Sequence, residues 1–505
     1  MMTQATVLKP DDIVETVRAA LQYIAVYHAP DYLAHLASAY AREQSPAAKA
    51  AMGQILESSR LAALGRRPIC QDTGMVTVFA RLGQSAMIAG DRTLYELVNE
   101  GVRLAYLDAG NPLRASMVAD PLLERRNTGD NTPAVTHVEL TRGNKLELLI
   151  AAKGGGSENK ARYTMLNPAA SVEDWVVSTI EGLGAGWCPP GLVGVGVGGS
   201  AEQAMLIAKR AVMEEIDMSD LLARGASTPL EEMRVRLYHR INALGIGAQG
   251  LGGLTTVVDV KLATAPTHAA SKPVALVPQC AANRHAKVVM DGSGPAYLDA
   301  PDLAAWPRIE GSEMAGLRRV NVDRLTREEM AGWAPGETLL LSGRILTGRD
   351  AAHKRMADML ARGEELPVSL RGRVIYYVGP VDPVDGEAVG PAGPTTATRM
   401  DPFTSDMLGQ GLFAMIGKAE RGAETVRDIA RHKAAYLIAV GGAAVLVAKA
   451  IRSSKVLAFE DLGMEAIREF TVEDMPVMVA VTTQGAAIHQ TGPAAWRGAQ
   501  QSAPA

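Results

Sequence analysis

The sequence predicts an α/β protein of two domains, and three observations support this prediction. The chain has 505 residues, which is too many for one hydrophobic core. Segments with strand and helix periodicity alternate along both halves. Between the halves lies a proline-containing stretch without strong periodicity. We therefore expect an N-terminal domain over residues 1–293, a linker over 294–320, a smaller C-terminal domain over 321–490 and a flexible tail over 491–505.

The composition excludes several classes of protein. A hydrophobic content of 47% and a charged content of 21% are typical of a globular protein. The net charge of -4 gives no basic footprint for nucleic acid. No apolar run reaches the roughly 18–20 residues that a membrane span needs, and residues 1–10 lack the pattern of a secretory signal. The three cysteines fit a reducing compartment, so we expect a cytoplasmic protein.

Apolar spacing predicts the elements of the N-terminal half. Residues 11–64 read as helices, because Ile13, Val17 and Leu21 recur at helical spacing. Another amphipathic helix, over 93–107, ends at a turn-rich stretch. The other elements expected here are strands over 134–140, 146–152, 255–262 and 274–277, and helices over 172–183 and 230–243.

The C-terminal half repeats the alternation of strands and helices. The strands expected here lie over 338–345, 374–378, 412–416, 434–440, 455–459 and 477–481, with helices over 349–361 and 424–432. This alternation predicts a compact α/β layer structure.

The three cysteines lie in unusual loops, about a hundred residues apart. Cys70 opens the run Cys-Gln-Asp-Thr-Gly between a helical segment and an apolar strand. Cys188 precedes two prolines, which predict a rigid, extended corner. Cys280 ends a predicted strand at what resembles a strand-to-helix switch.

Buried thiols without a ligand are one interpretation of these cysteines, because free cysteine is commonly a small core residue. The alternative is a metal group, favoured by the polar, proline- and glycine-containing surroundings. Three thiolates on an iron–sulfur cubane leave one iron without a protein ligand, and that iron can act as a Lewis acid. Zinc makes a weaker case with three widely separated thiolates.

Two glycine-rich stretches allow different interpretations. Residues 153–160 (KGGGSENK) directly follow a strand, and backbone N–H groups there can form an anion-binding concavity. The P-loop spacing is absent, and a flexible turn with solvated lysines is the alternative. Residues 192–199 (LVGVGVGG) superficially resemble a dinucleotide fingerprint. Their spacing favours a packed strand–helix turn instead.

Three further loops carry candidate functional side chains. Residues 390–400 combine a fixed backbone, adjacent hydroxyls and a guanidinium, which can clamp a carboxylate. Residues 342–353 carry two arginines and a histidine. For both loops the alternative is a capped helix start with solvated arginines. His268 is a lone histidine, but its loop lies beside the strand that ends at Cys280, which favours a functional role.

Taken together and in this order, these loops resemble the signature loops of class I fumarate hydratases, the iron–sulfur fumarases. The resemblance covers about residues 10–490 and rests on residues 70–74, 153–160, 188–190, 245–250, 342–353 and 390–400. It implies an N-terminal α/β cluster domain and a C-terminal α/β swivelling domain fused in one chain. It also implies reversible hydration of fumarate to L-malate between the two domains, by a homodimer.

The resemblance also implies roles for individual residues. A [4Fe-4S] cluster would be held by Cys70, Cys188 and Cys280. Thr395 would be the base for the C3 proton, supported by Asp72. Thr396 would contact the substrate and His268 would lie near the leaving hydroxyl. The residues implied to grip the carboxylates of this small dicarboxylate substrate are Gln71, Arg114, Gly155, Arg349, Arg399 and Lys418.

Three other functions remain as alternatives. L-tartrate dehydratase is a related three-cysteine hydro-lyase, but it usually has separate subunits and a cysteine where this chain has Ser157. Mesaconate could also be accepted, since one added methyl changes binding by only a few kcal/mol. A non-enzymatic iron–sulfur sensor or electron carrier would usually have four protein ligands to the cluster. The missing fourth cysteine argues against this last class.

Overall fold

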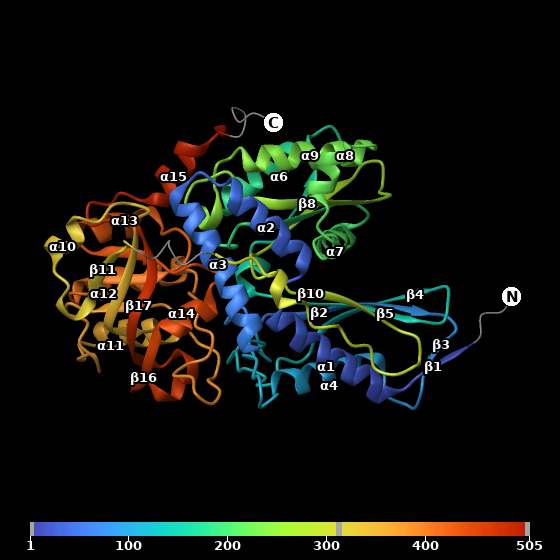
Figure 1. The fold of residues 1–505 in the computed structure, drawn as a ribbon, viewed down its shortest axis with the longest axis horizontal. Coiled ribbons are helices and arrows are strands. Elements are labelled where there is room, and N and C mark those ends of the chain that lie inside the picture. Colours follow the sequence, from blue (N-terminus) through green and yellow to red (C-terminus); the bar gives the residue numbers. More distant parts are fainter. Residues whose placement is uncertain (1–4, 310–315, 500–505) are drawn as a thin grey trace.

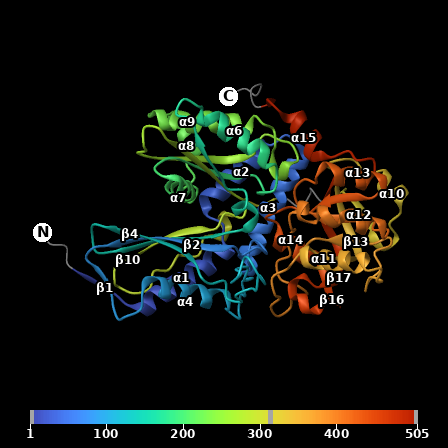
Figure 2. The ribbon, with the colours of Figure 1, turned by 180° about the vertical axis from the view of Figure 1, so that it is seen from behind.

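The computed structural model of the chain describes residues 5–309 and 316–499, and it confirms the predicted α/β class (Figure 1). Strands up to Met290 form three sheets, and strands from Arg318 onward form a separate sheet of seven strands. The C-terminal half, orange to red, lies beside the N-terminal half in both views (Figure 2). None of the helices in the described ranges is long and apolar enough to cross a membrane.

The first N-terminal sheet has the order β10-β5-β2-β4, and helices α1 and α4 pack together against it. Helix α4 begins with a capping box between Thr93 and Glu96. Gly101 lets the two helices approach closely, because a Cβ there would lie 2.6 Å from Cβ of Val17. The elements of this region are β1 (Thr6–Leu8), α1 (Pro10–Val26), β2 (Met75–Gly83), β3 (Ala86–Ile88), α4 (Leu94–Tyr106), β4 (Val135–Thr141), β5 (Leu146–Lys153) and β10 (His285–Met290).

The second N-terminal sheet has the order β6-β9-β7-β8 and is covered by helices on both faces. On one face, Gly194 and Gly196 of β7 let α7 lie directly on the strand. On the other face, Val193 and Val195 pack with α6 and α9. The elements are β6 (Arg162–Leu166), α6 (Val172–Leu183), β7 (Gly191–Gly198), α7 (Ala201–Ala211), α8 (Met218–Arg224), α9 (Pro229–Asn242), β8 (Val257–Ala265) and β9 (Lys272–Gln279). The glycine-rich stretch is thus a packed strand–helix unit, as predicted.

Helix α3 (Pro46–Gly65) lies between the N-terminal sheets and the C-terminal half (Figure 1). Helix α2 (Pro30–Arg42) packs on α3 and β8 within the N-terminal half. Helix α3 begins with Ser45, whose side chain accepts a hydrogen bond from the N–H of Ala48. It packs against α14, and Oγ of Ser58 accepts a hydrogen bond from the N–H of Leu446. Helix α3 therefore contributes part of the contact between the two halves.

The C-terminal sheet has the order β11-β12-β13-β14-β15-β17-β16, with a further pairing of β12 with β17. That pairing closes strands β12 to β15 and β17 into a ring, because β17 is long enough to contact β15, β16 and β12. The elements are β11 (Arg318–Asn321), α10 (Arg327–Ala331), β12 (Thr338–Thr347), α11 (Asp350–Ala361), β13 (Val374–Tyr376), α12 (Asp401–Gly409), β14 (Ala414–Gly417), α13 (Ala423–Arg431), β15 (Ala435–Ile438), α14 (Ala444–Ala450), β16 (Ile451–Ala458), β17 (Ile467–Val481) and α15 (Ile488–Trp496).

Regular structure extends into the ends of the predicted linker and of the predicted tail. Strand β11 begins at Arg318, inside the predicted linker, and Trp306 of that linker is buried and donates to Oγ of Ser59 at 3.0 Å. Residues 310–315 of the predicted linker lie outside the described ranges. The predicted tail is helical up to Trp496, because Gly492 of α15 packs tightly against Gly252 of the N-terminal half.

The close packing of α7 on β7 gives a stability prediction. A Cβ at Gly196 would lie 2.2 Å from the carbonyl oxygen of Ala204, so Gly196→Ala must push the helix away from the strand. We expect a loss of about 1–3 kcal/mol in the free energy of unfolding, measured by urea denaturation. The control is Gly182→Ala in α6, where nothing lies within 4 Å of the added methyl group. That change should be neutral or stabilising by about 0.5–1 kcal/mol. Equal effects of the two variants would contradict this account of the packing.

Candidate active site

One cavity brings all three cysteines together with residues of both halves. The loops that line it from the N-terminal half follow α3, β5 and β9 or precede β7. The C-terminal half contributes segments that precede η5 (Ala397–Met400) or follow β14 and β15. The lining residues are Cys70, Gln71, Asp72, Gly154, Gly156, Ser157, Cys188, Cys280, Ala282, Arg284, Pro394, Lys418, Gly441 and Gly442. This cavity is the candidate active site.

The loop that contains Cys70 connects α3 to β2, as predicted, and it is tied to both halves. Nε2 of Gln71 donates to the carbonyl of Pro394 in the C-terminal half at 3.2 Å. The carboxylate of Asp72 accepts from the N–H of Gly74 at 3.2 Å and from the N–H of Gly155 at 2.8 Å. Gly155 opens the short helix α5 (Gly155–Glu158), so the predicted anion-binding stretch here binds the carboxylate of Asp72.

The electrostatic surroundings of Asp72 keep it ionised. Burial raises the pKa of this carboxyl, but the positive charges of Arg114, Arg284 and Lys418 and the N–H of Gly155 outweigh that effect. The net result is a pKa below the ordinary value. The nearest of the ion pairs joins Nη2 of Arg114 to Oδ1 of Asp72 at 3.9 Å. Asp72 is therefore a half-buried carboxylate that is ionised at neutral pH.

The backbone at Cys188 corrects the prediction of an extended corner. Its φ is 60°, in the left-handed region, and its N–H donates to the carbonyl of Ala185 in a tight turn. Sγ of Cys188 lies 3.0 Å from Nζ of Lys418. A Cβ at Gly441 would lie 2.6 Å from the same sulfur, so only glycine fits there. The turn thus directs the thiol at the C-terminal half.

Gln249 joins the Cys188 loop to the C-terminal half, and the sequence analysis did not single it out. Its φ is 55°, and both its N–H and its Nε2 donate to the carbonyl of Pro189 at 2.8 Å. Its Oε1 accepts from the N–H of Gly441, also at 2.8 Å. One side chain therefore fixes the distance between the Cys188 loop and the segment after β15.

The loop of Cys280 passes from one N-terminal sheet to the other, and it is held by His28. Nε2 of His28 donates to the carbonyl of Ala281 at 2.9 Å, and Nδ1 accepts from Oγ of Ser59 at 2.8 Å. Burial lowers the pKa of His28 to about 4, so the ring is neutral at pH 7. The N–H of Ala281 also donates to the carbonyl of Cys188, which links two of the three cysteine loops.

The three thiols surround the cavity from separate loops and do not converge on one point. Among residues 5–309 and 316–499, no three His, Cys, Asp or Glu side chains are close enough to hold a single metal ion. Burial raises the pKa of Cys70 to about 11 against the pull of Arg284, and it raises the pKa of Cys188 against that of Lys418. A group that binds each thiolate at a different metal atom fits this arrangement better than a single zinc ion does.

Arg114 and Arg349 meet at Gly379, close to Asp72. Nη1 of Arg114 donates to the carbonyl of Gly379 at 2.5 Å, and a Cβ at Gly379 would lie 3.0 Å from Nη1 of Arg349. Arg349 is paired with Glu465 at 2.6 Å, a carboxylate that the sequence analysis missed. Burial lowers the pKa of Arg114. These two guanidinium groups can bind the carboxylates of a dicarboxylate. A carboxylate that binds Arg349 must compete with Glu465 for that side chain.

Three predicted site residues, Thr395, Thr396 and Arg399, lie in η5 or just before it, and each has different surroundings. The N–H of Thr395 donates to the carbonyl of Tyr377 at 2.7 Å, and its own carbonyl accepts from the N–H of Lys418 at 3.1 Å. The backbone of Thr396 forms an isolated parallel β-bridge with that of Lys418. Arg399 is half-exposed and paired with Asp350. In the described part of the chain, no hydrogen bond joins the hydroxyl of Thr395 to Asp72.

His268 is the predicted site residue that the structure separates from the cavity. It is exposed in the turn between β8 and β9, whereas Cys280 follows the other end of β9. The eight residues of β9 span about 26 Å at ~3.3 Å per residue. Within one chain, His268 and Cys280 therefore lie at opposite ends of β9. The role of His268 beside the leaving hydroxyl stays a prediction.

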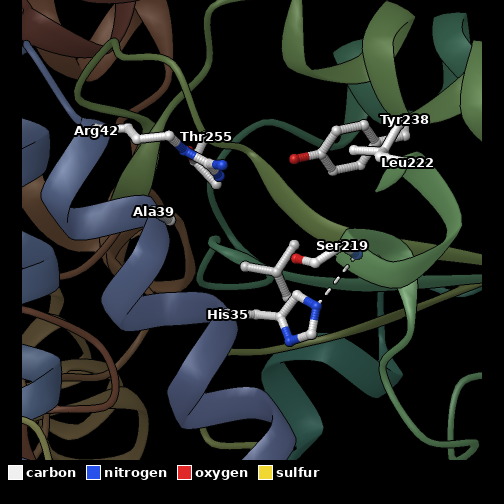
Figure 3. A pocket seen from close by; sticks show the side chains of 8 residues that line it. His35, Ala39, Arg42, Ser219, Leu222, Tyr238 and Thr255 are labelled. Atoms are coloured by element: carbon white, nitrogen blue, oxygen red, sulfur yellow. Dashed lines mark hydrogen bonds between the residues drawn. The ribbon is translucent and has the colours of Figure 1, made fainter. Parts of the chain in front are cut away.

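A second cavity, of about 150 Å³, lies between α2, α8, α9 and β8 (Figure 3). Figure 3 shows the guanidinium of Arg42 and the hydroxyl of Tyr238 reaching into it from opposite sides. His35 on its wall has Nδ1 bonded to the carbonyl of Asp31, and its Nε2 accepts from the N–H of Ser219. None of the predicted site residues lines this cavity. It is therefore not the candidate active site.

Comparisons with known proteins give a consistent result. The family model described as fumarate hydratase (Fumerase) matches residues 14–289, and the model described as fumarase C-terminus matches residues 292–492. Fumarate hydratase class I, aerobic, of Escherichia coli K12 is 31% identical over 86% of this chain and 81% of that protein. Fumarate hydratase 2 of Leishmania major is 31% identical over 85% of this chain and 78% of that protein. A putative L(+)-tartrate dehydratase subunit alpha of Methanocaldococcus jannaschii is 34% identical over 55% of this chain and 95% of that subunit.

The neutral His28 gives a pH prediction. Its pKa is about 4 in the folded protein against 6.5 for an ordinary histidine, so the unfolded chain takes up a proton first as the pH falls. Folding stability should therefore decrease between pH 6.5 and 4, by about 3 kcal/mol from this group alone. His28→Gln keeps a donor and an acceptor but does not titrate, and it should lack this part of the pH dependence. Urea denaturation of both proteins at several pH values measures the difference, and parallel curves would contradict the prediction.

Proposed function

The chain belongs to the class I fumarate hydratase family of hydro-lyases, and on that premise we propose that it catalyses the reversible hydration of fumarate to L-malate. One observation carries the proposal. Cys70, Cys188 and Cys280 line a single cavity with the ionised Asp72 of the N-terminal half and the cation of Lys418 from the C-terminal half. Each half corresponds to a different matched family model.

We further propose that the three cysteines hold a [4Fe-4S] cluster. The thiols come from three loops around the cavity, and the buried guanidinium of Arg284 beside them has no hydrogen-bond partner in the described chain. Both features fit an anionic group larger than a single ion. When bound, such a cluster supplies a Lewis-acidic iron that polarises the hydroxyl leaving group.

The cations of this chain would bind the two carboxylates of the substrate. Arg114 and Arg349 lie together at Gly379, and Lys418 reaches the thiols from the opposite half. Positive charge so placed stabilises the negative charge that develops on a carboxylate when the neighbouring C–H proton is removed. The N–H of Gly155 is engaged by Asp72, so in this geometry it orients the base.

We propose that the hydroxyl of Thr395 removes the proton at C3 and that Asp72 activates this hydroxyl. A threonine hydroxyl is a poor base unless a carboxylate activates it. Asp72 is ionised at neutral pH because three cations surround it. Thr395 is buried, its backbone pairs with that of Lys418, and it follows Pro394 in the cavity wall, which is the proposed place of the substrate.

A second candidate substrate is L-tartrate, favoured by the 34% identity of the N-terminal half to a putative tartrate dehydratase subunit alpha. The C-terminal half here is part of the same chain. Ser157 stands where tartrate dehydratases usually have a cysteine. It is buried and accepts a hydrogen bond from Nζ of Lys153 at 2.9 Å. This serine therefore supports the glycine loop and does not add a thiol to the cavity.

The function can be tested by anaerobic assays on protein reconstituted with iron and sulfide. We expect conversion of fumarate to L-malate, read by the loss of fumarate absorbance, with three to four irons bound per chain. L-tartrate and mesaconate are assayed in parallel. If the protein binds iron but converts only L-tartrate, the proposed substrate is wrong and tartrate is the substrate. A protein that binds no iron would overturn the proposed cofactor.

The role of Thr395 gives a separate prediction. Thr395→Ala removes the proposed base, so turnover of fumarate should fall by roughly 10²–10⁴-fold. The iron content should not change, because Thr395 is not among the proposed ligands. Thr398→Ala, three residues later in η5, is the control and should keep normal turnover. Normal turnover of Thr395→Ala would assign the proton transfer to another residue.

A further inference from the structure

Arg284 carries a buried positive charge whose only role so far is to lower the pKa of Asp72 together with Arg114 and Lys418. Only 1% of the residue is exposed to solvent. Within the described chain, none of its three guanidinium nitrogens has a hydrogen-bond partner. An isolated buried charge is costly, and buried charges in proteins are normally paired or bound to a ligand. The anomaly therefore indicates that Arg284 has a partner outside the described part of the chain.

Other deeply buried arginines in the structure do have partners. Arg234 of α9 donates to Asp217, to Asp259 and to the carbonyl of Val260. Arg421 donates to Asp401 and to Oγ1 of Thr404. This fold thus satisfies buried guanidinium groups elsewhere, and Arg284 departs from that pattern.

The backbone around Arg284 holds the guanidinium in the wall of the active-site cavity. Arg284 lies four residues after Cys280, directly before β10, and its carbonyl accepts a hydrogen bond from the N–H of Ala152 at 3.1 Å. Asn283, the residue before it, accepts from Gln279 and bonds to His285. A Cβ at Gly154 would lie 3.5 Å from Nη2 of Arg284 and 3.2 Å from Oδ2 of Asp72. The guanidinium therefore faces the space that the thiols surround.

We propose that Arg284 is a positioning residue for the iron–sulfur cluster, donating its N–H groups to the cluster's sulfur atoms and balancing its negative charge. The inference rests on the proposed cofactor. Hydrogen bonds and positive charge at the sulfurs of a cluster raise its reduction potential, and partners behind the metal ligands strengthen metal binding.

The test compares Arg284→Met with the parent protein in metal-free and reconstituted forms. Methionine has a similar length without the charge, so the metal-free variant should melt at a higher temperature than the metal-free parent. In the reconstituted variant the affinity for iron, measured by chelator competition, should fall by about 10- to 100-fold. The reduction potential of the cluster, measured by voltammetry, should shift to more negative values. Arg284→Lys keeps the charge and should recover part of both losses.

Arg234→Met is the matched control, because Arg234 is buried in the same half but fully paired. It should lower the melting temperature of both forms and leave iron affinity and potential unchanged. Unaltered iron affinity and potential in Arg284→Met would overturn the role of Arg284 while the parent still binds iron and hydrates fumarate. A parent protein that binds no iron would overturn the proposed cofactor and this inference with it.

Discussion

The half-buried carboxylate of Asp72 lies among positive charges, and the rest of the active-site architecture depends on that balance. Arg114 and Arg284 lower its pKa from the N-terminal half, and Lys418 does so from the C-terminal half. The pKa of Lys418 is raised, because the combined attraction to Cys188, Cys70 and Cys280 outweighs the opposing effect of burial. The ionised state of Asp72 therefore depends on the cations around it. The loops must therefore be held with precision, and hydrogen bonds to the backbone hold them.

The two halves meet through polar contacts that surround the cavity. Gln249 reaches Gly441, and Gln71 reaches Pro394. Arg67, almost fully buried, donates to the carboxylate of Glu387 and to the carbonyl of Asp382. Hydrogen bonds of this kind are directional, so they fix the relative position of the halves. Apolar contacts add to them, because Ala62 and Ile69 pack with Val445 of the C-terminal half. A movement of one half would change the surroundings of Asp72 at the same time.

Much of the fold was readable from local patterns, whereas the site was readable only in part. Alternating and helical periodicity located α6, β5 and β12, because each buries a regular face. The edge strand β6 was missed, because exposed positions such as Tyr163 weaken its pattern. The loops of the three cysteines were found from their polar, rigid composition. The isolation of His268 and the lack of partners around Arg284 depend on contacts between distant segments, which no local pattern encodes.

The anchoring of Trp306 on α3 has a consequence for how the two halves stay associated. Its indole donates to Ser59 of the N-terminal half, and the C-terminal sheet begins soon afterwards at Arg318. The covalent tether between the halves is therefore much shorter than the stretch between β10 and β11 suggests. A short tether gives the C-terminal half an effective concentration in the millimolar range at its binding surface. Contacts too weak to hold two separate subunits together can therefore suffice in the fused chain.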